Sequence, residues 1–102
     1  MAAESGFRLD RGEPGTLAVS GTLGFATAAE ALRALNEALR AGDRSRLDLA
    51  GVRSCDSAGL ACVLAVLATA REHGQAVSLQ HVPEGLRTLA QVSGVEALLA
   101  PG

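Results

Sequence analysis

The stretch LDLAGVRSCDSAGLACVL, residues 47–64, joins a short apolar segment to a long apolar helix through a small polar loop. Residues 47–50 predict a short strand, which we expect at the centre of a sheet. Residues 51–54 are expected to form a connection. The helix is predicted from about Ser57 to His73, and Gly74 is the residue type that commonly ends a helix. A strand followed directly by a helix is the repeating unit of α/β domains.

The predicted helix has two faces that differ in the size of their side chains rather than in polarity. At about 100° per residue, the larger side chains fall on one side, which we assign to the core. The other side carries small residues and has no charge before Glu72. The large face comprises Leu60, Val63, Leu64, Val66, Leu67 and Ala70, and the small face comprises Ala58, Ala61, Cys62, Ala65, Ala68, Thr69 and Glu72.

The small face has two interpretations. Another helix of the same chain could cover it, because alanines permit close approach. Alternatively, it is exposed and docks on a partner protein, because a flat apolar patch is unusual on the surface of a monomer. We favour docking, since a chain of 102 residues has little left to cover the outer side of a helix that already lies on a sheet.

The loop before the helix supplies Asp56 and Ser57, and both have a structural and a functional interpretation. Either side chain can cap the helix by accepting a hydrogen bond from a free backbone N–H group. A hydroxyl beside a carboxylate at a helix N-terminus is also a plausible point of recognition or phosphorylation. Gly59 would allow another group to approach the first turn closely.

The remaining motifs do not predict catalysis or a bound cofactor. Neither His73 nor His81 is placed to serve as a base for Ser57, and the Gly-x-Ser-x-Gly pattern is absent. The sequence contains no phosphate-binding loop, zinc-ligand spacing or dinucleotide fingerprint. We therefore expect no enzyme activity, no metal and no cofactor, and we interpret both histidines as structural.

Composition limits the partners and the location. The chain is 48% hydrophobic and 20% charged, has a net charge of -2, and contains two Phe but no Tyr or Trp. This balance predicts a folded domain and argues against nucleic acid or an anionic lipid surface as a partner. No apolar run reaches about 18 residues and no signal peptide is recognisable, so we expect no membrane insertion. Cys55 and Cys62 are expected to be small, partly buried thiols in a reducing cytoplasm, with a disulfide or a metal site as the alternative.

The rest of the chain predicts alternating strands and helices. Residues 6–11 and 16–20 are expected to form an antiparallel hairpin around a turn at 13–15. Thr27 and Glu30 have the spacing of a capping box at the start of a helix that Gly42 ends. A strand at 76–80 precedes a helix with Pro83 at its first position; Ser93 and Gly94 end this helix, and a short turn follows at 95–100. The prediction is a single α/β domain over residues 1–102, with a mixed sheet of about four strands and helices packed mainly on one face.

Residues 47–52 followed by 55–60 resemble the signature of STAS domains, the domains of sulfate transporters and anti-sigma factor antagonists. The resemblance extends from about Leu9 to Leu99 and implies a non-enzymatic interaction module. In the antagonists, the hydroxyl residue just before the loop glycine is phosphorylated by a partner kinase, which switches partner binding off. Ala58 occupies that position here, and Ser57 is its neighbour.

The loop is more similar to that of MlaB-like STAS subunits, in which no phosphorylation is required. The resemblance implies a cytoplasmic subunit, peripheral to the inner membrane, that binds the ATPase of an Mla-type ABC phospholipid transporter. An anti-sigma factor antagonist that binds a kinase-type anti-sigma factor, with Ser57 as its phosphorylation site, is the alternative. The predicted partner-binding residues are Asp56, Ser57, Ala58, Gly59, Ala61, Cys62, Ala65 and Thr69.

Overall fold

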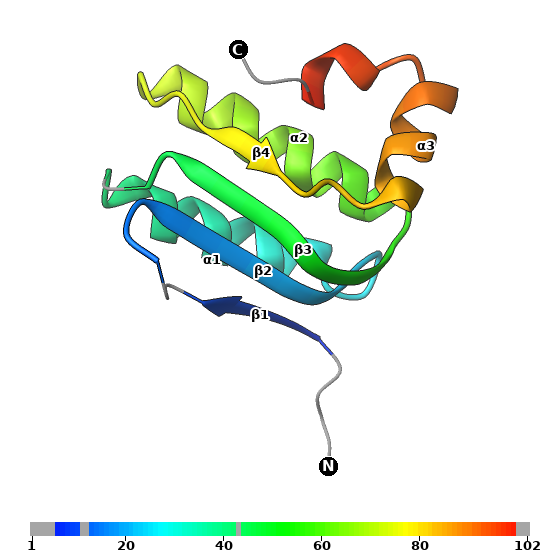
Figure 1. Cartoon of the computed structure of the whole chain (residues 1–102), viewed down its shortest axis with the longest axis horizontal. Coiled ribbons are helices and arrows are strands. Elements are labelled where there is room, and N and C mark those ends of the chain that lie inside the picture. Colours follow the sequence, from blue (N-terminus) through cyan, green and yellow to red (C-terminus); the bar gives the residue numbers. More distant parts are fainter. Residues whose placement is uncertain (1–5, 11–12, 43, 100–102) are drawn as a thin grey trace.

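The computed structural model describes residues 6–10, 13–42 and 44–99, and the alternation of strands and helices follows the predicted order (Figure 1). Arg11 and Ala100, at the ends of two predicted elements, lie outside the described residues. No helix within these ranges is long and apolar enough to cross a membrane. The elements are β1 (Phe7–Asp10), β2 (Thr16–Leu23), α1 (Ala28–Arg40), β3 (Arg46–Cys55), α2 (Ser57–Glu72), β4 (Ser78–Gln80), α3 (Glu84–Val92) and the 3-10 helix η2 (Glu96–Leu99).

The four strands form one mixed sheet in the order β1-β2-β3-β4. Strand β1 pairs with β2 in antiparallel orientation, which confirms the predicted hairpin, and β2, β3 and β4 are parallel. The predicted central position of residues 47–50 is also confirmed, because β3 lies between β2 and β4. Since the parallel strands are adjacent in chain order, the right-handed crossovers place α1 and α2 side by side on one face of the sheet (Figure 1).

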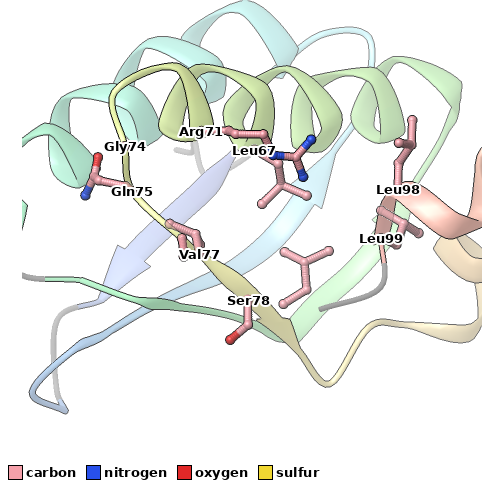
Figure 2. Close-up of a pocket in the computed structure, with 10 residues that line it drawn as sticks. Leu67, Arg71, Gly74, Gln75, Val77, Ser78, Leu98 and Leu99 are labelled. Atoms are coloured by element: carbon pink, nitrogen blue, oxygen red, sulfur yellow. The ribbon is translucent and has the colours of Figure 1, made fainter. Parts of the chain in front are cut away.

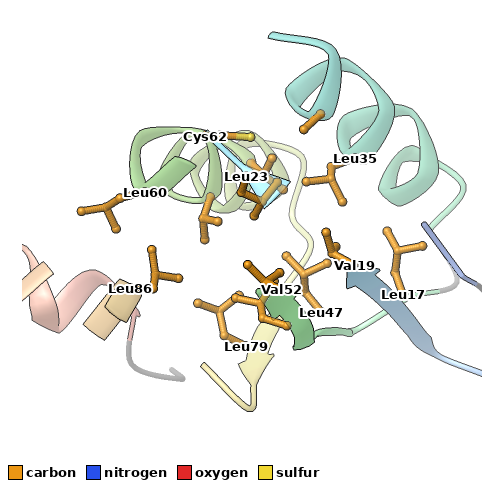
Figure 3. Packing of buried hydrophobic residues seen from close by; sticks show 14 of the residues in the cluster. Leu17, Val19, Leu23, Leu35, Leu47, Val52, Leu60, Cys62, Leu79 and Leu86 are labelled. Atoms are coloured by element: carbon orange, nitrogen blue, oxygen red, sulfur yellow. The ribbon is translucent and has the colours of Figure 1, made fainter. Parts of the chain in front are cut away.

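The core lies between this helical layer and the sheet, and it is built from leucine, valine and alanine (Figure 3). Both crossover helices and all three parallel strands contribute to it, and α3 adds Leu86. Within α2, the prediction for the large face is confirmed for Leu60, Val63, Val66 and Ala70, whereas Leu64 and Leu67 are only half-buried. The largest fully buried side chains are Leu17, Leu23, Leu35, Leu47, Leu49, Leu86, Val19, Val63 and Val66.

The prediction that residues 51–54 form a connection is wrong, because β3 continues through them to Cys55. This segment pairs with residues 20–22 of a longer β2, and Cys55 pairs with Leu23; the register shifts between Ala18 and Ser20 and between Gly21 and Thr22. A β-carbon at Gly51 would lie 2.6 Å from the Ser20 β-carbon. Glycine therefore permits a close approach of the two strands at this irregularity.

The capping box predicted for Thr27 and Glu30 is also wrong. Thr27 has a helical backbone, and its side chain makes no cap hydrogen bond. Its buried hydroxyl instead donates to the Thr22 carbonyl and accepts from the Gly24 N–H group, both at 3.0 Å. This side chain therefore closes the turn between β2 and α1. Pro83 is the N-cap of α3 rather than its first helical residue.

Candidate docking site at the start of helix α2

Asp56 organises the site by joining three segments of the chain. It has an extended backbone between β3 and α2, and its Oδ1 atom accepts a 3.0 Å hydrogen bond from the Gly59 N–H group. Its Oδ2 atom accepts a 3.1 Å bond from the N–H group of Phe25, in the loop between β2 and α1. The predicted cap is therefore confirmed for Asp56, whereas Ser57 is the first helical residue.

The two hydrogen bonds also fix the charge of Asp56. The backbone N–H group of Gly59, followed by that of Phe25, lowers the pKa of the Asp56 carboxyl below its ordinary value. Hydrogen bonds that favour the ionised form have this effect. The site thus presents a carboxylate whose two oxygens both accept backbone hydrogen bonds.

Two glycines allow the helix, the strand end and the loop to pack this closely. A β-carbon at Gly59 would lie 2.0 Å from the Leu23 carbonyl oxygen and 2.8 Å from the Cys55 Sγ atom. A β-carbon at Gly24 would lie 3.0 Å from Asp56 Oδ2. The approach predicted at Gly59 is therefore made by the end of β2.

Phe25 is the site residue that sequence reasoning missed. Its side chain is 88% exposed, the highest value among the exposed large hydrophobic residues of the described chain. Its backbone N–H group donates to Asp56, so Phe25 lies next to the residue that caps α2. The sequence did hold a signal for Phe25, because it is one of only two aromatic residues in the chain and stands in a loop.

The small face of α2 is partly covered by α1, as the first interpretation predicts, and partly exposed to solvent, while docking on a partner stays a prediction. Figure 3 shows the Cys62 side chain directed toward α1, and Cys62 is only 4% exposed. Gly59 is also buried, which leaves both residues unavailable to a partner. Asp56, Ser57 and Ala61 are exposed, and the half-buried predicted residues are Ala58, Ala65 and Thr69.

The two cysteines are free thiols, as expected. Burial, and to a lesser extent the nearby Asp56 carboxylate and Cys62, raises the pKa of the Cys55 thiol to about 11. Burial also raises the pKa of Cys62. Both thiols are therefore neutral near pH 7, the form in which cysteine is a poor nucleophile and a poor metal ligand.

The histidines lie away from the Asp56–Ser57 pair. His73 Nδ1 lies 2.9 Å from the Thr69 carbonyl oxygen at the end of α2, and His81 Nδ1 lies 3.0 Å from Asp48 Oδ1. In the described ranges, no group of three or more His, Cys, Asp or Glu side chains is arranged to hold a metal ion. The chemistry that this site does offer is recognition by an exposed ring, a hydroxyl, a carboxylate and a small helical surface.

Solved structures with the same architecture define the class of fold. The unphosphorylated form of the anti-sigma factor antagonist SpoIIAA matches with a TM-score of 0.62 at 17% identity, covering 83% of this chain and 81% of that chain. The phosphorylated form, described as a Bacillus cell fate determinant, matches with a TM-score of 0.64 at 18% identity, covering 90% and 86%. Mglu matches with a TM-score of 0.57 at 26% identity, covering 76% of this chain but 19% of that chain. The fold is therefore a STAS fold.

The sequence family is more specific than the fold. The family model described as "Mlab, STAS domain" matches residues 8–100. The chain belongs to this STAS family, whose members are generally binding proteins rather than catalysts. No curated protein sequence matches the chain at a significant level.

Proposed function

We propose that the protein is a non-catalytic subunit that binds the ATPase of an Mla-type ABC phospholipid transporter. Binding supports the assembly and activity of the transporter, and thereby intermembrane phospholipid transport and outer-membrane lipid asymmetry. The subunit resides in the cytoplasm and associates with the inner membrane through its partner. The match to the MlaB-type family supports this assignment.

The observation that carries the proposal is the exposure of Phe25, Asp56, Ser57 and Ala61 at the start of α2, where we place a docking surface. We define this surface as Phe25, Asp56, Ser57, Ala58, Ala61 and Ala65. The exposed Phe25 ring is an aromatic anchor of the kind that dominates binding energy at protein interfaces. Complete burial of such a side chain contributes about 2 kcal/mol. The adjoining alanines leave room for a partner's backbone or helix to approach.

Ala58 favours a permanent subunit over a switched one. By resemblance, this position carries the phosphorylated hydroxyl in anti-sigma factor antagonists, and alanine has no oxygen to accept a phosphate. Binding at this surface is then constitutive. The subunit can activate the ATPase only by binding its active conformation more tightly than its inactive conformation.

Affinity purification from a membrane extract tests this function. The tagged protein is expected to retain an ABC ATPase and its permease, identified by mass spectrometry. Ala61→Arg places a long charged side chain in the docking surface and should abolish their recovery. Ala41→Arg adds the same side chain at an exposed position beyond the far end of α1 and should leave recovery unchanged. Equal recovery with the Ala61 variant would refute the docking surface, and recovery of other proteins alone would refute the assigned partner.

The alternative function is that of an anti-sigma factor antagonist, which the SpoIIAA-like fold and the exposed Ser57 hydroxyl favour. Its partner would be a kinase-type anti-sigma factor. Incubation with such a kinase and ATP, followed by phosphate mapping, separates the two functions. Stoichiometric phosphorylation of Ser57 that releases the kinase would support the antagonist, and an unmodified Ser57 would support the transporter subunit.

A further inference from the structure

A concave surface lies toward the other end of α2, away from the docking surface. The second half of α2, the segment leading into β4, and η2 enclose a groove of about 570 Å³ (Figure 2). This volume falls within the roughly 300–1,000 Å³ typical of small-molecule sites. The groove is open on one side, so a ligand there remains partly in contact with water.

The lining of the groove is mainly aliphatic. Leu79 and Leu99 are buried, at 9% and 7% exposure, whereas Leu98 is 51% exposed. Leu67 and Val77 are half-buried and complete the apolar surface. An aliphatic chain placed along these side chains would remove apolar surface of both partners from water, which favours binding.

Among the described residues that line the groove, Arg71 is the one with an ionisable side chain. Figure 2 shows its guanidinium group over the groove, between the side chains of Leu67 and Leu98. Within the described part of the chain, no acceptor lies within hydrogen-bond or ion-pair distance of this group. The groove therefore combines an apolar surface with a cation that has no partner among the residues that the structure describes.

The other polar side chains of the lining are engaged elsewhere. Gln75 Nε2 donates a 2.8 Å hydrogen bond to the Leu39 carbonyl, and Ser78 Oγ lies 3.5 Å from the Ser45 carbonyl. Both side chains point away from the groove in Figure 2. Arg71 is thus the side chain left to bind a ligand head group, and it selects an anion.

We propose that this groove binds an amphiphilic anion, with an aliphatic chain on Leu67, Val77, Leu98 and Leu99 and an anionic head group on Arg71. A carboxylate and a phosphate monoester both match a guanidinium group through paired N–H donors. This site is separate from the docking surface and does not depend on the partner assigned above.

Titration of the ¹⁵N-labelled protein with four eight-carbon probes tests the site. Octanoate and octyl phosphate carry the anionic head groups, octanol is neutral, and octyltrimethylammonium is cationic. Both anions are expected to shift the amide resonances of Leu67, Val77, Leu79 and Leu98. At least one anion should bind roughly fivefold more tightly than octanol, the upper range for a partly exposed ion pair. The tighter anion identifies the head group.

Variants separate the roles of charge and apolar surface. Arg71→Ala should remove the preference for anions over octanol, whereas Arg33→Ala, an equal charge change on the exposed face of α1, should preserve it. Leu98→Asp, at a half-exposed position, should weaken the binding of every anionic probe. Resonance shifts outside the groove, or equal affinities of octanoate, octyl phosphate and octanol for the unaltered protein, would overturn the proposal.

Discussion

The Oδ2 atom of Asp56 lies 3.1 Å from the backbone nitrogen of Phe25, a residue 31 positions earlier in the chain. This contact joins the start of α2 to the loop after β2. The same carboxylate caps the helix through Gly59, so one side chain both caps α2 and holds the backbone of Phe25. The start of α2 and the placement of the Phe25 backbone beside it therefore both depend on Asp56.

Asp56→Asn should separate these two roles. Asparagine has a single acceptor oxygen, so only one of the two backbone N–H groups can keep its partner. Asparagine is also a good helix cap, and we expect it to retain the bond from Gly59. Amide hydrogen exchange should then accelerate at Phe25 much more than at Gly59. Equal acceleration at both amides would show that the carboxylate does not hold the loop independently of the cap.

Acidification should lower the stability of the folded protein by protonating the Asp56 carboxylate. Its pKa is lowered in the folded state, so its stabilising contribution is present above the unfolded pKa near 3.8 and is lost as the pH falls through the lower folded value. Asp48 behaves in the same way, chiefly because the Ala50 N–H group donates to it. The melting temperature should therefore decrease as the pH is lowered below about 4. The slope of melting temperature against pH should be shallower in Asp56→Asn and in Asp48→Asn. An unchanged slope in both variants would contradict this assignment.

Gly59→Ala should be strongly destabilising, because its β-carbon would collide with the Leu23 carbonyl oxygen at 2.0 Å. We expect a loss of roughly 3 kcal/mol or more in the free energy of unfolding. Gly85→Ala is the matched control, since Gly85 lies in α3 and a β-carbon added there would meet no described atom within 4 Å beyond its chain neighbours and its own helix backbone. This substitution should stabilise the protein by about 0.5–1 kcal/mol. Chemical denaturation of both variants measures the free energy of unfolding, which should fall in Gly59→Ala and rise in Gly85→Ala.

Cys55 should resist alkylation in the folded protein. Its pKa of about 11 leaves little thiolate at neutral pH, and its side chain is half-buried. Iodoacetamide should therefore modify Cys55 far more slowly than it modifies the unfolded chain, in which both thiols react at the ordinary rate. Rapid modification of Cys55 alone in the native protein would indicate a reactive thiol at this site and would reopen a catalytic role.

The order of elements and the mixed sheet could be predicted because they depend on local patterns. Alternating apolar residues, helix-ending glycines and the polar residues before the helix at Ser57 each act within a few positions. The continuation of β3 through residues 51–54 could not be predicted in this way, because those mostly exposed residues resemble a loop and acquire strand structure by pairing with β2.

The candidate site was predictable only in part for the same reason. The cap at Asp56 follows from its position before a helix, but the contact between Asp56 and Phe25 depends on the tertiary fold. The division of the small face between α1 and solvent likewise depends on how the two helices pack, which buries Cys62 and exposes Ala61. Helical periodicity places both residues on one face but cannot assign a neighbour to it.

The affinity of the purified protein for the purified transporter ATPase tests the central claim most directly. Phe25→Ser removes an 88% exposed ring, so the melting temperature should change little, whereas the affinity measured by calorimetry should fall by about tenfold or more. Val92→Ser, at an 82% exposed position on α3, is the matched control and should bind as the unaltered protein does. Equal affinities of the Phe25 variant and the unaltered protein would contradict the docking surface proposed for this STAS domain.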